Sequence, residues 1–271
     1  MSHRINAERL FSEAKWRGSF MSKEKLLSVN ARTVNARRLQ QLLLDYHNYR
    51  LLRDEHPLAQ DIDRLCDWQA ERLKRTHNDL YSNRRYHEAL DFLLKDLYSP
   101  KEFTRRDADL ERVFPVMVKL LPDTALHTIA DLVELNLLTQ QLDEHIAAVL
   151  REMNIERITE DNYAEAFRRC DNFASRRRQI TLIDKTGHEL EKYVKSRFIS
   201  FSLKITEGPA EMAGLGQLHS FLSRGFKAFK EMGGVSQLLR VIMQRESHIL
   251  EQIQVNADSP FTLPDNLRAY A

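Results

Sequence analysis

The chain has 271 residues, of which 42% are hydrophobic and 30% are charged, and its formal net charge at pH 7 is +2. These values are ordinary for a globular protein, and the near-neutral charge excludes a strongly basic nucleic-acid protein as the default class. The 8 Gly and 7 Pro fall well below average usage, which would give roughly 19 and 14. Because helix breakers are scarce and good helix formers abundant, we predict an all-α fold, a multi-helix bundle or orthogonal helical array of about ten helices.

The first third of the chain predicts three helices, at 6–16, at 22–53 and from Pro57 to about Tyr81, each with apolar residues at helical spacing. A fourth helix is expected at 85–98, where apolar side chains share one face.

The end of that fourth helix carries a capping signature. Ser99 is placed to cap the following helix, with Pro100 at the first helical position and Glu102 at the third. In such a capping box the Ser oxygen accepts a backbone N–H, and the Glu side chain returns to the N–H of the capping residue. We therefore predict a tight helix–helix corner, with Leu97 and Tyr98 at its apex.

Two prolines punctuate the middle of the chain. Pro115 is expected to kink or split a helix, and Pro122 to end it. Asp123 or Thr124 would then cap the next helix, 124–151, whose apolar arc is so wide that we expect it at the centre of the fold.

The second half of the chain predicts four more helices, at about 159–183, 188–205, 208–233 and 235–254. Thr159 is the expected cap of the first, Gly187 is expected to interrupt it, and Gly233 is the expected C-terminal cap of the third. The run "RFISFSLKI" (197–205) could pass for a strand, but its neighbours favour helix. The expected organisation is one domain over 1–256, with a subdomain seam near 115–123 and an extended tail at 257–271.

The stretch "YHEALDFLLKDLYSPKEFTRRDADLERVFP" resembles the bacterial proteins named for an FFLEELY motif, a family of unknown function. The segment 92–98, "FLLKDLY", occupies the motif position, where Phe92 matches and Lys95 replaces a Glu. The later segment 213–234 also resembles that family. The resemblance implies an α-helical protein and transfers no catalytic residue. The residues that we assign to this structural motif are Phe92, Asp96, Leu97, Tyr98, Ser99 and Glu102.

The segment "GPAEMAGLGQLHSFLSRGF" suggests a candidate ligand site on the predicted helix 208–233. Its small residues would either let another helix pack closely or open a cleft with an apolar wall beyond it. The helix start at Gly208 would also leave free N–H groups for an anion. The candidate ligand-binding residues are Pro209, Gly214, Gly216, His219, Phe221 and Phe226.

The segment "RRCDNFASRRR" (168–178) carries a basic stripe that would meet phosphate, RNA or an acidic partner, unless it is simply a solvated face. The candidate residues are Arg168, Arg169, Arg176, Arg177 and Arg178. No helix–turn–helix spacing accompanies them.

Familiar catalytic and metal-binding signatures are absent from the sequence. There is no HExxH, paired-Cys or Glu-x-x-His pattern, so we assign no metal ligand, and only a site assembled from distant helices stays open. There is no GxSxG and no phosphate-binding loop. Cys66 and Cys170 are expected to be reduced, and Arg168 and Arg169 would lower the pKa of Cys170 if they faced it.

The leading hypothesis is a cytoplasmic helical protein that binds a protein partner or ligand without catalysis, through the 208–230 helix and the corner at 92–103. An alternative is an enzyme or carrier with an apolar pocket for a lipid-like or aromatic compound or a haem. A further alternative is a nucleic-acid-associated regulator, although we expect no nucleic acid by default. No stretch of about 18 apolar residues predicts a membrane span. The cofactor and the oligomeric state stay unassigned.

Overall fold

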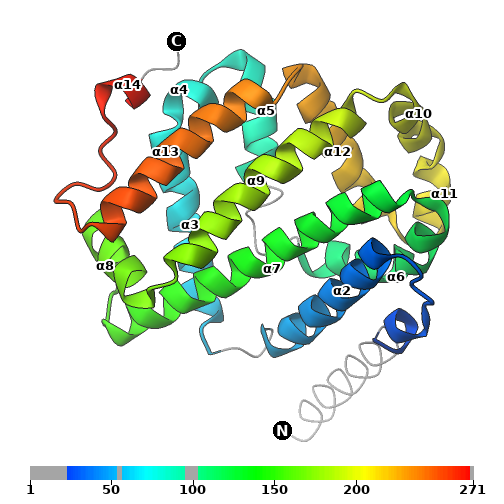
Figure 1. Cartoon of the computed structure of the whole chain (residues 1–271), viewed down its shortest axis with the longest axis horizontal. Helices are drawn as coiled ribbons and strands as arrows, with labels where there is room; N and C mark the ends of the chain where they lie inside the picture. Colours follow the sequence, from blue (N-terminus) through cyan, green and yellow to red (C-terminus); the bar gives the residue numbers. More distant parts are fainter. Residues whose placement is uncertain (1–22, 54–56, 95–102, 269–271) are drawn as a thin grey trace, which may run out of the picture.

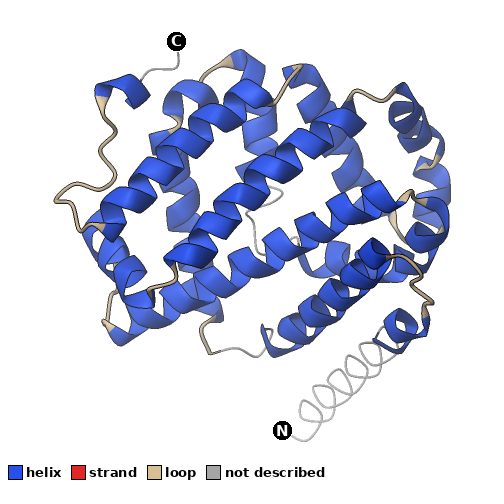
Figure 2. Ribbon diagram, in the orientation of Figure 1, coloured by secondary structure: helices blue, strands red, loops and turns tan. Residues whose placement is uncertain are grey.

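The computed structural model describes residues 23–53, 57–94 and 103–268. Throughout these ranges the regular structure is helical and contains no strand, which confirms the all-α prediction (Figure 2). Residues 23–28 form a first helical turn and a half. The labelled helices are α2 (Val34–Arg53), α3 (Ala59–Thr76), α4 (Asn78–Tyr81), α5 (Arg84–Phe92), α6 (Phe103–Leu120), α7 (Asp123–Glu152), α8 (Glu160–Cys170), α9 (Phe173–Val194), α10 (Arg197–Ile205), α11 (Glu207–Met212), α12 (Gly216–Met232), α13 (Ser236–Gln254) and α14 (Asp265–Arg268).

The helices form a layered array (Figure 1). In the near layer α2, α7, α9 and α13 lie side by side, and their contacts run in that order. Behind them lie α3, α5, α6 and α12, while α10 and α11 close the right-hand end of Figure 1. The long helix α7 contacts α2, α3, α8 and α9 and contributes to two of the three buried apolar clusters, which confirms its predicted central position.

The predicted long helix at 22–53 is wrong, because the chain leaves the helix after residue 28 and re-enters it at Val34. The hydroxyl of Thr33 accepts a hydrogen bond from the Ala36 backbone N–H at 3.1 Å, which starts α2. The helix predicted from Pro57 to Tyr81 is present but is divided at His77 into α3 and α4. The helix predicted at 6–16 lies outside the described residues.

Pro115 does not split its helix, since α6 runs without interruption from Phe103 to Leu120. Pro122 follows the end of α6, as predicted, and it also occupies the N-cap position of α7 without any side-chain cap. The predicted cap at Asp123 or Thr124 is therefore wrong. The Asp123 carboxylate instead accepts a hydrogen bond from the Asn35 amide at 2.6 Å, which joins α7 to α2.

The helix that we predicted at 159–183 begins where expected but ends well before residue 183. Thr159 and Asn162 form a reciprocal capping box, which confirms the cap. The helix then ends at Cys170, because Asp171 adopts a left-handed conformation with φ of 46°. The predicted interruption at Gly187 is also wrong. Gly187 lies inside α9, where an added Cβ would come within 2.7 Å of Leu239 Cδ1, so this glycine permits close packing of α9 on α13.

The helix predicted at 208–233 is two helices, α11 and α12. Gly214 lies between them with φ of +70°, a conformation that favours glycine and reverses the chain. Gly233 ends α12 as a left-handed C-cap, as predicted. The segment 197–205 is helical and the last long helix, α13, closely matches its prediction. The single-domain organisation and the seam near 115–123 stay predictions.

The segment after α13, which we predicted as an extended tail, packs against the helices. Pro260 is buried, and the Phe261 ring packs against the rings of Trp68 and Tyr163, with centroids 6.4 and 6.1 Å away. A short helix, α14, follows. The tail thus completes the first apolar cluster, which α3, α7, α8 and α13 build.

Candidate functional site

The two segments that carry the family resemblance pack against each other. An added Cβ at Gly225 of α12 would lie 2.7 Å from Phe92 Cζ of α5, so the glycine makes room for this ring. Phe92 also contacts the rings of Phe221 and Phe229, with centroids 5.2 and 6.2 Å away. The remaining motif residues lie outside the described residues: Asp96, Leu97, Tyr98, Ser99 and Glu102.

The small residues that we expected along one continuous helix, where they would permit close packing or open a cleft, lie instead around the turn between α11 and α12. Pro209 belongs to the six-residue helix α11, Gly214 makes the turn, and Gly216 begins α12. The Arg112 guanidinium donates to the Ala213 and Gly214 carbonyls at 3.0 and 3.2 Å, which fixes the turn on α6. The interpretation of Gly214 and Gly216 as one helix face is therefore wrong, and close packing occurs at Gly225.

The other candidate ligand residues point to separate places. His219 Nε2 donates to the Leu203 carbonyl at 2.7 Å, which ties α12 to α10. Phe221 packs on Phe92, whereas the Phe226 ring lies beneath the Lys230 ammonium at 5.6 Å. These three side chains do not line one common wall, and their role in ligand binding stays a prediction.

The predicted basic stripe is divided between α8 and α9. Arg168 and Arg169 both bind Glu165, at 2.8 and 2.7 Å, and hydrogen bonds from Arg169 and Arg168 hold the pKa of that carboxyl below its usual value. Arg176 is buried, donates to a backbone carbonyl of α7, and covers the Phe167 ring at 4.8 Å.

The last two arginines of the stripe are also engaged within the chain. Arg177 donates to the Gln254 side chain at 3.0 Å, and Arg178 donates to Glu134 at 2.8 Å. These internal partners do not favour a shared phosphate-binding surface, so the nucleic-acid patch stays a prediction without structural support.

The two cysteines are free thiols in apolar surroundings. Cys66 is buried in the first apolar cluster, and Cys170 packs against the same cluster. Burial raises the pKa of the Cys170 thiol, against the opposing influence of Arg176. The condition under which Arg168 and Arg169 would lower this pKa is not met, because both side chains bind Glu165.

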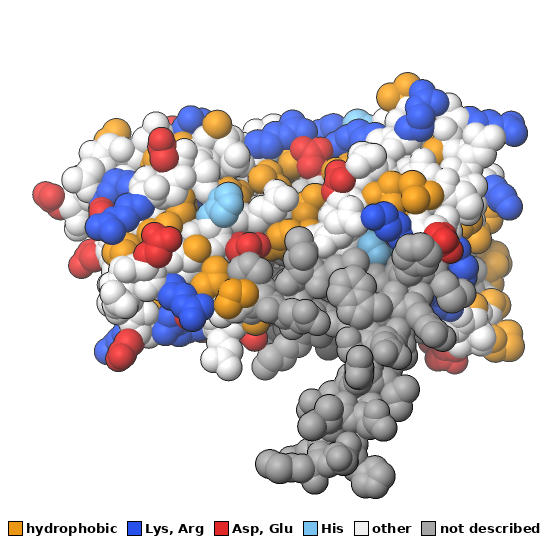
Figure 3. Space-filling model, turned by 90° about the horizontal axis from the view of Figure 1, so that it is seen from below, with side chains coloured by type: hydrophobic (Ala, Val, Ile, Leu, Met, Phe, Trp, Pro, Cys, Tyr) orange, Lys and Arg blue, Asp and Glu red, His pale blue; other side chains and the backbone are white. Residues whose placement is uncertain are grey.

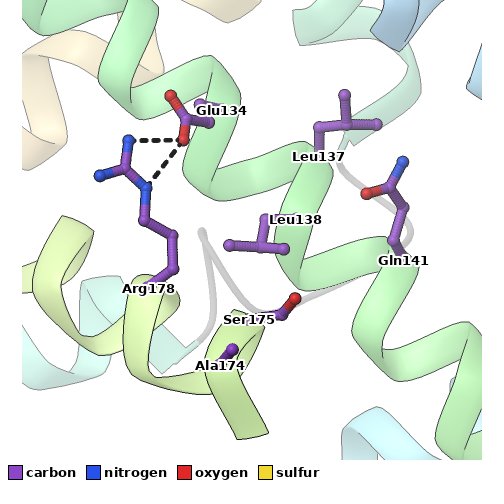
Figure 4. Close-up of a pocket in the computed structure, with 7 residues that line it drawn as sticks. All are labelled: Glu134, Leu137, Leu138, Gln141, Ala174, Ser175 and Arg178. Atoms are coloured by element: carbon purple, nitrogen blue, oxygen red, sulfur yellow. Dashed lines mark hydrogen bonds and ion pairs between the residues drawn. The ribbon is translucent and has the colours of Figure 1, made fainter. Parts of the chain in front are cut away.

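An open groove of about 360 Å³ lies between α7 and α9 (Figure 4). Leu137 and Leu138 line its apolar part, and at one end the Arg178 side chain reaches across from α9 to Glu134 on α7. The lining residues are Glu134, Leu137, Leu138, Gln141, Ala174, Ser175 and Arg178. None of these except Arg178 was a candidate from the sequence.

Farther along the same two helices lies a cluster of charged side chains around Asp131, which is 1% exposed. Arg38 of α2 binds Asp131 Oδ1 at 2.6 Å and also pairs with Glu134. Lys185 of α9 lies 2.6 Å from Asp131 Oδ2. Although burial raises it, the pKa of the Asp131 carboxyl is held below its usual value by hydrogen bonds from Lys185 and Arg38.

His127 and Glu189 complete this group, which we call the polar cluster: His127, Asp131, Lys185 and Glu189. The Lys185 ammonium lies 2.8 Å from His127 Nε2. Glu189 accepts a hydrogen bond from the Thr128 hydroxyl at 2.6 Å, which fixes its carboxylate beside α7. The cluster thus brings together two side-chain pairs of i,i+4 spacing, one from α7 and one from α9.

A second feature is a group of large apolar side chains exposed at the end of the molecule formed by α6, α10 and α11. We call it the apolar end face, and its members are Val116 (53% exposed), Leu120 (75%), Phe201 (61%), Ile205 (57%) and Met212 (85%). Phe201 and Ile205 share one face of α10 by their i,i+4 spacing. The bonds from Arg112 to the residues after Met212 bring α11 beside α6. Figure 3 shows hydrophobic side chains gathered at this right-hand end.

The charges around the apolar end face are mainly positive. The charged residues within 112–120, 197–205 and 207–212 are Arg112, Lys119, Arg197, Lys204, Glu207 and Glu211, all of them exposed. Arg112 pairs with Asp109 at 3.1 Å, so the three other positive charges against two negative ones leave the rim with a net charge of +1.

Neither feature was foreseen from the sequence, although local signals for both exist. Phe201 and Ile205 stand four residues apart in "RFISFSLKI", and His127 and Asp131 stand four apart in α7. Such spacings are also common in buried or solvated helices, so only the tertiary arrangement distinguishes them.

The fold and these two features define an all-α helical array with a charged inter-helical cluster and an apolar end. Among the described residues, none of the helices combines the length and apolar character needed to cross a membrane. The chain belongs to the family described as "Domain of unknown function (DUF8198)", whose model matches residues 48–260. Neither a curated protein nor a solved structure matches the chain. The family match does not test the resemblance to the FFLEELY-motif proteins, which stays a prediction.

Proposed function

We propose that the protein acts by binding a protein partner at the apolar end face. The observation that supports this function is the exposure of five large apolar side chains, from three different helices, at one end of the molecule. Single exposed hydrophobic residues are normal on a protein surface, but contiguous ones mark interaction sites. Burying one such side chain contributes about 1.5–3 kcal/mol before the costs of association, so a few suffice for a specific contact.

The chemistry of the rim indicates what kind of partner fits. Apart from the pair between Arg112 and Asp109, the rim residues carry a net charge of +1, and the positive groups Lys119, Arg197 and Lys204 have no acidic residue beside them in 112–120 or 197–205. Charge complementarity favours a segment with apolar anchors flanked by Asp or Glu. An amphipathic helix is the common form of such a segment, because its anchors recur at i, i+3 and i+4. The partner that we propose is therefore an acidic amphipathic helix.

The two alternative functions have less support. A small-molecule or cofactor pocket was expected around Gly214, His219 and Phe221, but the glycine lies in a turn and the other two side chains contact α10 and α5. A nucleic-acid role was expected from the arginines at 168–178, which bind acidic, amide and backbone groups of the same chain.

The test is a quantitative affinity purification of the full chain from its own host. The variant Phe201→Asp with Ile205→Asp places two acids on the apolar end face. The control is Val255→Asp, because Val255 is 70% exposed and follows α13 at the opposite end of the molecule (Figure 1). We expect a partner to be enriched with the wild type and with Val255→Asp, and lost with the double variant.

The recovered partner must then bind the purified protein directly, with an affinity that falls as salt rises, because the basic rim contributes. Equal recovery of every protein by the double variant and the wild type would contradict the proposal.

A further inference from the structure

The Lys185 ammonium occupies a position among three side chains that commonly bind metal ions. One ligand atom each from His127, Asp131 and Glu189 lies within 4.8 Å of the other two. The Lys185 Nζ atom is 2.6 Å from Asp131 Oδ2 and 2.8 Å from His127 Nε2. We infer that His127, Asp131 and Glu189 form a site for a divalent transition metal of the Zn²⁺ type, in which Lys185 holds the cation position until the metal displaces it.

The tautomer of His127 favours this role. The Asn35 amide nitrogen donates to Asp123 Oδ2 at 2.6 Å, which leaves the Asn35 oxygen to face His127 Nδ1 at 3.2 Å. Because that oxygen can only accept, Nδ1 carries the proton, and the Nε2 lone pair points toward Lys185 and Asp131. Metal-binding histidines typically show this pattern, in which a fixed acceptor holds one ring nitrogen and the other binds the metal.

The two carboxylates are also held from outside the site. Arg38 binds Asp131 at Oδ1, so Oδ2 remains for a cation at the position of Lys185. The Thr128 hydroxyl donates to Glu189 at 2.6 Å, which holds this carboxylate against α7. Each ligand therefore has a partner of its own that fixes its direction, as the outer groups of metal sites do.

The donor set and the charge together point to the class of metal. One imidazole nitrogen and two carboxylate oxygens suit Zn²⁺ and its neighbours, whereas Ca²⁺ and Mg²⁺ prefer oxygen ligands alone. Ligand atoms around a tetrahedral Zn²⁺ lie about 3.3 Å apart, so donors that lie within 4.8 Å of one another need to close by up to about 1.5 Å as the ion binds. The two carboxylates offset the charge of the ion once Lys185, which is 42% exposed, swings into solvent, while Arg38 stays on Asp131 Oδ1.

Isothermal titration of untagged, metal-free protein with Zn²⁺ tests the inference, and titration with Co²⁺ adds a visible spectrum that reports the ligand geometry. We expect one Zn²⁺ per chain at this site, and loss of that binding in His127→Ala and in Glu189→Gln. The decisive variant is Lys185→Met, which removes the competing cation and is expected to bind Zn²⁺ at least about tenfold more tightly.

A matched control lies on the same helix. His188 and Asp184 form an exposed i,i+4 pair 3.3 Å apart, and His188→Ala is expected to leave binding at the site unchanged. Absence of binding to both the wild type and Lys185→Met would overturn the inference. So would binding that survives in both His127→Ala and Glu189→Gln. Glu189 is partly exposed, so Glu189→Gln is expected to fold even if His127→Ala does not, and it then tests the site alone. The result is independent of whether the apolar end face binds a partner.

Discussion

Two regions of the molecule place charged and apolar groups in opposite ways. Where α13 meets α3 and α4, Arg245 is buried, Glu246 is largely buried, and both are held by partners of opposite charge. At the end formed by α6, α10 and α11, large side chains such as Leu120 and Met212 remain in solvent. Burying a charge is costly unless it is paired, and exposing apolar surface forgoes stability. The first region therefore stabilises the fold, and the second is the surface at which we propose that a partner binds.

The largest expected effect is at Arg245, which is 1% exposed and binds both carboxylate oxygens of Asp79 at 2.7 Å. Its Nε also donates to the Leu267 carbonyl, which joins the C-terminal segment to α13. Arg245→Met is expected to lower the free energy of unfolding by about 2–4 kcal/mol, because it removes the buried guanidinium that holds the Asp79 carboxylate and two backbone carbonyls. Urea denaturation measures this loss. The control Arg240→Met, on the exposed face of α13, is expected to change stability by less than about 0.5 kcal/mol. Equal losses would contradict the stabilising role of the buried pair.

The next effect is acid sensitivity from Glu246, which accepts from Arg72 at 2.7 Å and contacts His77 at 2.9 Å. Although burial raises it, the pKa of Glu246 falls from 4.5 to about 2, because the charge of Arg72 and a hydrogen bond from His77 favour its carboxylate form. A lowered folded-state pKa means that the unfolded chain binds more protons at low pH. The contribution is therefore complete above about pH 4.5 and is lost as the pH falls toward 2, by on the order of 2–3 kcal/mol.

Urea titrations between pH 6 and pH 3 would separate this contribution from other carboxylates. Glu246→Gln is expected to be less stable than the wild type at pH 6, with the difference shrinking as the pH falls. A difference that stays constant over this range would contradict the assignment.

A smaller effect is expected at the contact between α5 and α12. Gly225→Ala would push a methyl group against the Phe92 ring and lower stability by about 1–3 kcal/mol. At Gly208 of α11 an added Cβ would meet no atom within 4 Å apart from its chain neighbours and its own helix backbone, so Gly208→Ala is expected to be neutral or stabilising by up to about 1 kcal/mol. Thermal melting of the two variants checks the contrast. Equal melting temperatures would show that Gly225 is not needed for the contact between α5 and α12.

The smallest stability effect is expected at the apolar end face itself. Phe201→Asp is expected to change the free energy of unfolding by less than about 0.5 kcal/mol, because the side chain is 61% exposed. Chemical denaturation checks this value. A loss above about 2 kcal/mol would show that Phe201 supports the fold instead of serving an interaction.

Local signals in the sequence predicted the helical elements well. The Thr159 cap, the Gly233 C-cap and the helical character of 197–205 each depend on a few neighbouring residues, and all three are confirmed. The central position of α7 also followed from its own apolar pattern, since a helix that is apolar over a wide arc needs neighbours on several sides.

The errors occurred where distant contacts decide the conformation. Asp171 ends α8 in a left-handed conformation that nothing in its residue type requires. Gly187 was predicted to break a helix, yet its missing side chain serves the contact with Leu239. The sequence likewise could not show whether Gly214 packs or turns, because either use depends on α6.

The candidate sites were less predictable than the fold for the same reason. His127 and Lys185 lie on different helices, and only the packing of α7 against α9 brings them together. The exposure of Phe201 and Ile205 is also a tertiary property, because the same amphipathic α10 could have buried these residues against a neighbour.

The most direct test of partner binding is site-specific photo-crosslinking in the host cell. One variant of the chain carries benzoylphenylalanine at position 205, and a second variant carries it at position 255. Because a single exposed residue changes, the fold and the rim charges are retained. We expect position 205 to give a discrete adduct with one other protein, in which the crosslink lies on an acidic amphipathic helix, and position 255 to give none. Crosslinks only to a second copy of the chain, or the same adducts from both positions, would contradict partner binding at the apolar end face.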